Sequence, residues 1–226
     1  MKTILCLFLI FCTQAFAHDC YPAPMHPNLM ELSTSPRVFY IPQFLSPSDC
    51  EHIIAKARPL LARSTVVDNS NKGSVLHQAR TSEGMFFPQF PQDRVLRNLE
   101  ERIASITGIP RENGEALQVL HYEVGQEYQP HHDYFDPATP GGKENYDRGG
   151  QRIATFMVYL RTTEEGGETV FPHAHIGIKP VQGDAVLFYN CFPNGQEDVR
   201  TLHGGAPVLK GEKWIVTKWL RKGKFR

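Results

Sequence analysis

Hydrophobic residues are spaced differently in the two halves of the chain. In the first half they recur every three or four residues in two segments, a spacing typical of amphipathic helices. The first helix is expected to begin at Ser46 and to run to Leu61. The second is expected from Gln92 to Thr107, where Gly108 would end it. Each helix has one apolar stripe, so both are expected to pack against a sheet.

Beyond Ala116 the pattern changes to short β-branched and aromatic runs separated by glycine, proline and asparagine. These runs predict strands, and their number and spacing favour a β-sandwich or jelly roll. The fold class expected from the two halves together is therefore mainly β with flanking helices. The runs are "ALQVLHYEV", "RIATFMVYL", "ETVFP", "HIGIKP", "DAVLFY" and "EKWIVTKWL".

The N-terminus has the pattern of a secretory signal peptide. Lys2 precedes the apolar run "ILCLFLIFC", and the small-residue site Ala15-Phe16-Ala17 follows it. We expect residues 1–17 to be cleaved, which would place the protein in the secretory pathway: the endoplasmic reticulum lumen, or the periplasm or exterior of a bacterium. A membrane anchor is the alternative, but the run is far shorter than the ~20 residues that span a bilayer. No stable membrane span is expected.

Composition narrows the remaining architecture and the class of partner. The chain has 226 residues, 41% of them hydrophobic, which suits one compact domain. We expect a proline-rich extended arm over residues 18–35 and a single domain over residues 36–222. With 24 basic and 24 acidic side chains and no long run of either sign, the chain has no basic footprint for nucleic acid. Nothing in it signals an oligomeric state.

Removal of the signal peptide would leave three cysteines, Cys20, Cys50 and Cys191. Disulfides persist in the secretory pathway, so these thiols can pair there. An odd number allows at most one internal bond, and which pair forms it stays open.

Candidate metal chemistry begins at "YQPHHDYF", residues 128–135. In an extended segment alternate side chains share a face, so His131 and Asp133 would point together and His132 away. With one distant histidine they would form a 2-His-1-carboxylate triad, which leaves open positions on iron. His203 in "RTLHGGAPV" is one candidate for the third ligand. Spacing alone also permits solvated loop histidines, and the other candidates for a third ligand are His121, His173 and His175.

A lysine lies close downstream on a run that otherwise resembles a buried strand. In "EKWIVTKWL", Lys213 shares one parity with Ile215, Thr217 and Trp219. Burying a lysine is costly unless it meets an anion, which makes Lys213 a candidate clamp for a dicarboxylate. The alternative is that Lys213 begins the strand at a turn and stays in water.

At these residues the sequence closely resembles the prolyl 4-hydroxylases, which are Fe(II)- and 2-oxoglutarate-dependent dioxygenases. The likeness is strongest to the small single-domain kind of plants, algae and some microbes, and it runs from about Pro36 to Leu220. It implies a double-stranded β-helix (jelly-roll) core. The segments that carry it are "STVVD", "ARTSEGMF", "ALQVLHYEVGQEYQPHHDYF", "GGQRIATFMVYL", "EEGGETVFP", "GDAVLF" and "LHGGAPVLKGEKWIVTKW".

The resemblance also implies roles for single residues. It assigns Fe(II) to three ligands and the distal carboxylate of 2-oxoglutarate to Lys213, with Tyr122 and Thr169 as further partners of that carboxylate. For the peptide substrate it suggests three groove residues and a mobile loop, although each of these could instead be a core aromatic or a surface charge. The ligands are His131, Asp133 and His203; the groove residues are Tyr128, Arg152 and Trp219; the loop residues are Arg80, Thr81 and Ser82.

The activity implied by the resemblance is hydroxylation of peptidyl proline to 4-hydroxyproline. It would consume O2 and 2-oxoglutarate, release succinate and CO2, and use ascorbate, with a proline-rich or collagen-like peptide as substrate. Departures from the family pattern occur at His132, at Ala206 and at Leu220-Arg221, and the link from Phe135 to Gly149 is individual to this chain. Two alternatives stay open, because a fold does not fix a substrate: oxidation of another residue or a small molecule, and a non-catalytic jelly-roll binding module.

Overall fold

The computed structural model describes residues 23–67, 73–75 and 78–226 of the chain. The expected signal peptide and Cys20 lie outside the described residues. Within them, no helix is long and apolar enough to cross a membrane. Cys50 and Cys191 are both free and buried.

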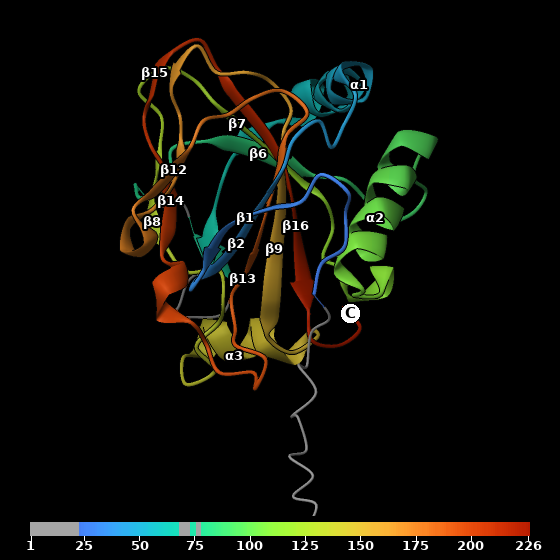
Figure 1. Ribbon diagram of the computed structural model, residues 1–226, viewed down its shortest axis with the longest axis vertical. Coiled ribbons are helices and arrows are strands. Elements are labelled where there is room, and N and C mark those ends of the chain that lie inside the picture. Colours follow the sequence, from blue (N-terminus) through green and yellow to red (C-terminus); the bar gives the residue numbers. More distant parts are fainter. Residues whose placement is uncertain (1–22, 68–72, 76–77) are drawn as a thin grey trace, which may run out of the picture.

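Most of the described chain forms antiparallel sheet, and two sheets build the core (Figure 1). The large sheet has eight strands in the order β1 (Met30–Thr34), β2 (Arg37–Ile41), β13 (Ala185–Tyr189), β9 (Arg152–Tyr159), β16 (Lys213–Arg221), β7 (Gln118–Tyr122), β6 (Glu83–Phe86) and β3 (Ala62–Arg63). The small sheet has four, in the order β12 (Ile176–Ile178), β11 (Thr169–Phe171), β14 (His203–Gly205) and β8 (Tyr128–His131). Two short pairs complete the strands: β10 (Glu165–Gly166) with β15 (Val208–Lys210), and β4 (Val66–Val67) with β5 (Ser74–Val75).

Helices α1 (Pro47–Ala57) and α2 (Arg94–Thr107) lie on the side of the large sheet away from the small sheet (Figure 1). Both expected helices are therefore confirmed, with shorter bounds. After α1 the chain continues as the 3-10 turn η1 (Arg58–Leu60), because Pro59 lacks the N–H that an α-helix interior needs. The N-cap of α2 is Asp93, whose carboxylate accepts a hydrogen bond from the backbone N–H of Leu96 at 3.0 Å.

Each face of the large sheet buries its own apolar cluster, and β16 contributes to both. Trp214 and Val216 pack with the helices in one cluster, whereas Ile215 packs between the two sheets in the other. This alternation is the period of two that a strand imposes. The expected inward face of β16, which starts at Lys213, is thus the face toward the small sheet. The two facing sheets confirm the jelly-roll expectation.

Two segments differ from the sequence-based expectation. Residues 30–34 of the expected arm form β1 and pair with β2, so the sheet begins before residue 36. The link between Phe135 and Gly149 contains α3 (Pro140–Asp147), which the hydrophobic spacing did not indicate. Its N-cap is Thr139, whose hydroxyl accepts from the backbone N–H of Gly142 at 3.1 Å, and Pro140 occupies the first turn. The remaining 3-10 turns are η2 (Arg111–Asn113), η3 (Pro172–Ala174) and η4 (Val199–Thr201).

Candidate metal centre and its two pockets

Strand pairing in the small sheet brings the three expected ligands together. β14 pairs with β8 so that His203 lies directly opposite His131. The Nε2 atoms of the two imidazoles lie 3.6 Å from the two carboxylate oxygens of Asp133, one from each. These three residues form the candidate metal group found among the described residues, with one ligand atom each, all within 4.8 Å of one another.

The surroundings hold each ligand in the form that a divalent cation needs. The Nδ1 atom of His131 lies 2.9 Å from the carbonyl of Gln129, and that of His203 lies 2.9 Å from the carbonyl of Thr201. A ring that donates from Nδ1 leaves the lone pair of Nε2 free for a metal. The hydroxyl of Thr155 donates a hydrogen bond to Oδ2 of Asp133 at 2.7 Å, which holds that carboxylate in place.

The pKa values of Asp133 and His203 also fit a metal site. Burial acts to raise the pKa of Asp133, but the neighbouring His203 and His131 hold that pKa well below its ordinary value. Burial, with His131 beside it, lowers the pKa of His203 to about 4. At neutral pH the site therefore offers one carboxylate and neutral imidazole, which fits a divalent metal held by two histidines and one carboxylate.

His132 points away from this group, as the strand argument expected. Its Nε2 lies 2.9 Å from the carbonyl of Val199, and its ring stacks on Tyr134. The geometry differs in one respect, because β8 ends at His131 and Asp133 reaches the site from a bend. Of the other candidate third ligands, His121 stacks on Trp214, while His173 and His175 lie at η3, outside the group.

A narrow inner pocket lies between the two sheets beside the triad, and Lys213 and Arg80 are the cations that line it. The lysine is 2% exposed, and burial lowers the pKa of its ammonium to about 7, with Glu168 acting in the opposite direction. Tyr122 and Thr169 line the same pocket, and the ammonium lies 5.6 Å from the Tyr122 ring centre. Burial of an amine beside so little negative charge fits an anionic ligand.

The glycine pair after His203 allows β14 to lie close to β8 and to Lys213. A Cβ atom at Gly204 would lie 2.8 Å from the backbone oxygen of Tyr128, a separation that real Cβ atoms essentially never show. One at Gly205 would lie 3.3 Å from the Lys213 ammonium and would crowd it. Glycine is thus required at position 204, where β14 passes β8, and Gly205 leaves room beside the Lys213 ammonium.

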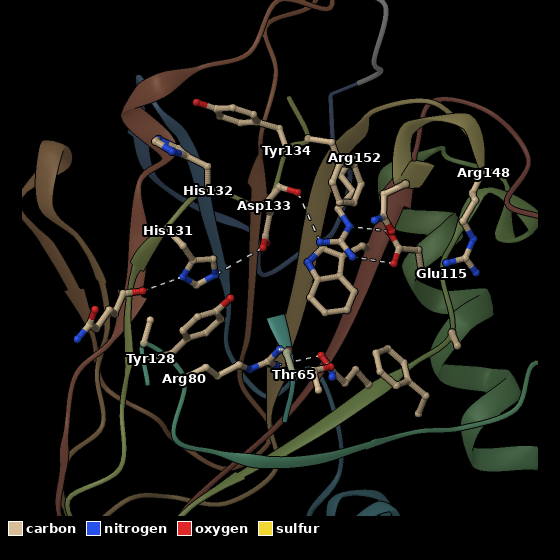
Figure 2. Close-up of a pocket in the computed structure, with 18 of the residues that line it drawn as sticks. Thr65, Arg80, Glu115, Tyr128, His131, His132, Asp133, Tyr134, Arg148 and Arg152 are labelled. Carbon is tan, nitrogen blue, oxygen red and sulfur yellow. Dashed lines mark hydrogen bonds and ion pairs between the residues drawn. The ribbon is translucent and has the colours of Figure 1, made fainter. Parts of the chain in front are cut away.

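A wider outer pocket of about 610 Å³ opens on the other side of the triad (Figure 2). The three expected groove residues, Tyr128, Arg152 and Trp219, line it together with Arg80 of the expected loop. The Tyr128 ring stacks on His131 with ring centres 3.7 Å apart, and the Arg80 guanidinium lies 4.8 Å from the centre of the Tyr128 ring. His131 and Asp133 line both pockets, so the candidate metal site is where the two meet.

The structure does not bring Thr81 and Ser82 into either pocket. The hydroxyl of Thr81 accepts from the backbone N–H of Glu127 at 2.8 Å, which ties the loop to the start of β8. Ser82 is fully buried, and its hydroxyl donates to that of Ser64 at 3.0 Å. Both side chains hold the loop, and only Arg80 of the three faces the groove.

A buried ion network supports the floor of the outer pocket. Glu115 accepts two hydrogen bonds from Arg152, at 2.6 and 2.8 Å, and its carboxylate lies 2.7 Å from Nε of Arg221. The Arg152 guanidinium lies 4.0 Å from the Trp219 ring centre. The network thus fixes the orientation of two groove residues.

Replacing Glu115 by glutamine is expected to destabilise the protein by about 3 kcal/mol, because two buried guanidinium groups lose their carboxylate. The measurement is urea unfolding of purified protein. Glu112→Gln, a nearby exposed glutamate, is the matched control and should change stability by less than about 0.5 kcal/mol. Equal stability of Glu115→Gln and wild type would contradict the role given to the network.

Sequence reasoning missed three residues at the site: Thr155, Glu115 and Arg148. The partners of Thr155 and Glu115 lie far away along the chain, so local spacing carries no signal for these two. Arg148 follows α3 and lines the outer pocket. Thr139-Pro140 was the usable signal there, since a threonine N-cap followed by proline is typical of a helix start.

Comparison with known proteins agrees with this geometry. Residues 117–221 match the 2OG-Fe(II) oxygenase superfamily. Prolyl 4-hydroxylase 1 of Arabidopsis thaliana is 45% identical over 205 residues, covering 84% of this chain and 71% of its own. Probable prolyl 4-hydroxylase 3 of the same plant is 42% identical, covering 86% and 72%. The viral collagen prolyl hydroxylase vCPH of Paramecium Bursaria Chlorella virus-1, solved with 2OG, superposes with a TM-score of 0.61 at 32% identity, covering 81% of this chain and 95% of the viral one.

The class is therefore that of the Fe(II)- and 2-oxoglutarate-dependent dioxygenases. Within it, the chain belongs to the prolyl 4-hydroxylase family. Its cofactor is Fe(II), with 2-oxoglutarate and O2 as co-substrates.

Proposed function

We propose that this protein hydroxylates peptidyl proline to 4-hydroxyproline. The reaction consumes O2 and 2-oxoglutarate, and one oxygen atom enters the proline while the other leaves in succinate, with release of CO2. The observation that carries the proposal is the arrangement of the two pockets. The buried Lys213 lines the narrow inner pocket, a wider aromatic groove forms the outer one, and His131 and Asp133 line both. When bound, Fe(II) with 2-oxoglutarate supplies the activation of O2 that this oxidation requires.

In this proposal His131, Asp133 and His203 hold the iron, and the inner pocket holds the co-substrate. Lys213 pairs with the distal carboxylate of 2-oxoglutarate, which restores the charge that burial disfavours in the free protein. Thr169 and Tyr122 line the same pocket and supply hydroxyl groups to that carboxylate. The 2-oxo acid end of 2-oxoglutarate then lies toward the metal ligands.

The outer pocket suits an extended, proline-rich peptide. Such a peptide adopts the polyproline II helix, whose backbone carbonyls make no internal hydrogen bonds and stay free to accept them. Two buried donors in the groove lack an acceptor among the described residues: Nε1 of Trp219 and Nε of Arg80. A shift of the neighbouring side chains on binding would open both donors to peptide carbonyls, and the preformed helix lowers the ordering cost of binding.

Trp219→Phe is expected to raise KM for a proline-rich peptide about 5- to 10-fold, because the ring stays and only the hydrogen bond to the peptide is lost. The KM for 2-oxoglutarate should not change. The measurement is steady-state kinetics with each substrate varied in turn.

Trp214→Phe is the matched control, since Trp214 lies on the same strand, is fully buried and faces the helices. It should leave the KM for peptide and the KM for 2-oxoglutarate within about twofold of the wild-type values. If Trp219→Phe also left the peptide KM unchanged, Trp219 would not donate to the peptide.

The rival within enzymes is oxidation of another residue, such as lysine, on the same scaffold. A peptide panel that contains proline-rich and lysine-rich members separates the two, with succinate release as the readout. Succinate above the peptide-free rate only with the proline peptides supports the proposal. Release driven by the lysine peptides alone would reject it, and release with neither, in the presence of bound iron, would favour the binding module.

The proposed place of action is the secretory pathway, on a proline-rich or collagen-like protein that passes through it. This rests on the leader-like pattern of residues 1–17, with its short apolar run and Ala15-Phe16-Ala17 site. The use of ascorbate stays a prediction of the family resemblance.

A further inference from the structure

The outer pocket continues past the ion network to an end that the proposed chemistry does not use. Asn145 and Arg148, at the C-terminal end of α3, line this end together with Phe225. In Figure 2 Arg148 lies beyond Glu115, on the side away from His131 and the candidate metal site. A bound peptide that reaches past Trp219 would pass this end.

The last residues of the chain are fastened along this end of the groove. The backbone N–H groups of Lys222, Gly223 and Arg226 donate to the carbonyls of residues 151, 149 and 148, each at 2.9 Å. The N–H of Phe225 donates to the carbonyl of Glu112, also at 2.9 Å. These residues therefore form a wall that lies between α3 and the turn after α2 (Figure 1).

This wall and the neighbouring Arg148 are strongly basic. Residues 221–226 read "RKGKFR", so four of the six are cationic, and Arg148 adds a fifth positive charge. Arg221 is already paired with Glu115. Arg148 is exposed, with its guanidinium 4.7 Å from the Phe225 ring and its Nε donating to the carbonyl of Arg226 at 3.3 Å.

No Asp or Glu side chain pairs with Arg148 within the described part of the chain, where its Nε contacts an oxygen of Arg226, the last residue described, at 3.3 Å. The acidic neighbour Asp147 is engaged elsewhere, since its carboxylate accepts from Lys143 at 2.8 Å. The one buried carboxylate near this end, Glu115, is shared between Arg152 and Arg221. Since no acidic side chain engages Arg148, the two terminal nitrogens of its guanidinium can bind a carboxylate in the groove.

We propose that Arg148, with the basic wall of residues 221–226 behind it, forms a subsite for a carboxylate of the peptide substrate. The substrate class this selects is a proline-rich peptide with an acidic residue a few positions from the target proline. The inference rests on the proposed function and adds to it a specificity determinant outside the iron and 2-oxoglutarate sites. A free C-terminal carboxylate of a peptide has the same chemistry, and the test separates the two sources.

The test compares peptides with one target proline sequence and different ends. Three have blocked termini and carry Asp-Asp, Asn-Asn or Lys-Lys on one flank, with each flank tried in turn. A fourth keeps the Asn-Asn flank and has a free C-terminal carboxylate. Binding is followed by fluorescence anisotropy and turnover by succinate release, so that KM and kcat are obtained separately.

For the wild type, KM for the Asp-Asp peptide should be about 5-fold below that for the Asn-Asn peptide, as expected for partly exposed ion pairs. The Lys-Lys peptide should bind most weakly, kcat should be alike for all, and 0.5 M NaCl should remove the differences. Arg148→Gln should raise KM for the Asp-Asp peptide about 5-fold and leave the Asn-Asn peptide within twofold.

Two further variants make the result specific. Arg148→Lys keeps the charge and should keep most of the preference. Arg94→Gln removes an exposed arginine of α2 that lines neither pocket and should change nothing. Preference for the free C-terminal carboxylate over the Asp-Asp flank would assign the same subsite to the end of a peptide chain.

Equal KM values for the Asp-Asp and Asn-Asn peptides in both wild type and Arg148→Gln would overturn the inference and leave the proposed function standing. A preference that survives in Arg148→Gln would overturn it as well. If the wild type hydroxylated none of the peptides and bound none, both the proposed function and the inference would fail.

Discussion

Alanine at His131, Asp133 or His203 is expected to lower hydroxylation more than about 100-fold and to weaken Fe(II) binding. Loss of a residue that hydrogen-bonds to a metal ligand typically lowers metal affinity or activity about 10- to 100-fold, so loss of a ligand itself should lower them more. The Nε2 atoms and the carboxylate form one group, with His131 and His203 each 3.6 Å from Asp133. Among the described residues the group has these three members, so it contains no further side chain to replace a missing ligand.

His132→Ala is the matched control, because His132 is adjacent in sequence and points to the carbonyl of Val199 instead. It should keep most of the wild-type activity and bind Fe(II) with unchanged affinity. Iron binding can be followed by equilibrium dialysis and turnover by succinate release. An inactive His132→Ala beside an active His131→Ala would contradict the assignment of ligands.

Lys213→Met is expected to raise KM for 2-oxoglutarate at least about 30-fold, because truncation of one partner of a buried charge pair costs 2–5 kcal/mol. The KM for peptide at saturating co-substrate should change little. The methionine is of similar length and apolar, so it fills the space of the lysine stem without its charge.

The same substitution should stabilise the metal-free, ligand-free protein. Burial lowers the folded-state pKa of Lys213 from 10.5 to about 7. Between these two pH values the unfolded chain holds a proton that the folded protein lacks, so stability rises with pH in this window. The cost of the lysine is therefore fully present below pH 7 and lost by about pH 10.5. The stability gained by Lys213→Met over wild type should therefore be larger at pH 6 than at pH 9, by about 2.7 kcal/mol.

Lys218→Met is the control on the same strand. Lys218 is as buried as Lys213, but its ammonium lies 2.5 Å from Glu100 on the helix side. Its loss leaves the buried carboxylate of Glu100 with Arg111 as its remaining cation, so this variant should be less stable while its KM for 2-oxoglutarate stays near that of wild type. If both variants raised that KM equally, the specific role of Lys213 would be wrong.

The residues on strands were the most predictable part of the site. The alternation of side chains along β16 placed Lys213 and Trp219 on one face from sequence alone, and they line the same pocket. The pairing of His203 with His131 was not available from local spacing, since it joins strands 72 residues apart. Only the family resemblance selected His203 from the other candidate histidines.

The supporting residues were not predictable, and the reason is distance along the chain. Glu115 is engaged by Arg152 and Arg221, and Thr155 donates to Asp133, all through contacts made only in the fold. Thr81 and Ser82 show the converse. Their positions matched the family pattern, but their hydroxyl groups bond within the loop and its neighbours.

The central claim is that the two pockets combine to oxidise a proline within a peptide. The direct measurement is mass spectrometry of a proline-rich peptide after incubation of residues 18–226 with Fe(II), 2-oxoglutarate and isotopically labelled O2. The account predicts gain of a single labelled oxygen, mapped by fragmentation to proline at the 4-position and equal in amount to the additional succinate formed. Additional succinate with oxygen on another residue, or an unmodified peptide beside iron-loaded and 2-oxoglutarate-bound protein, would contradict it.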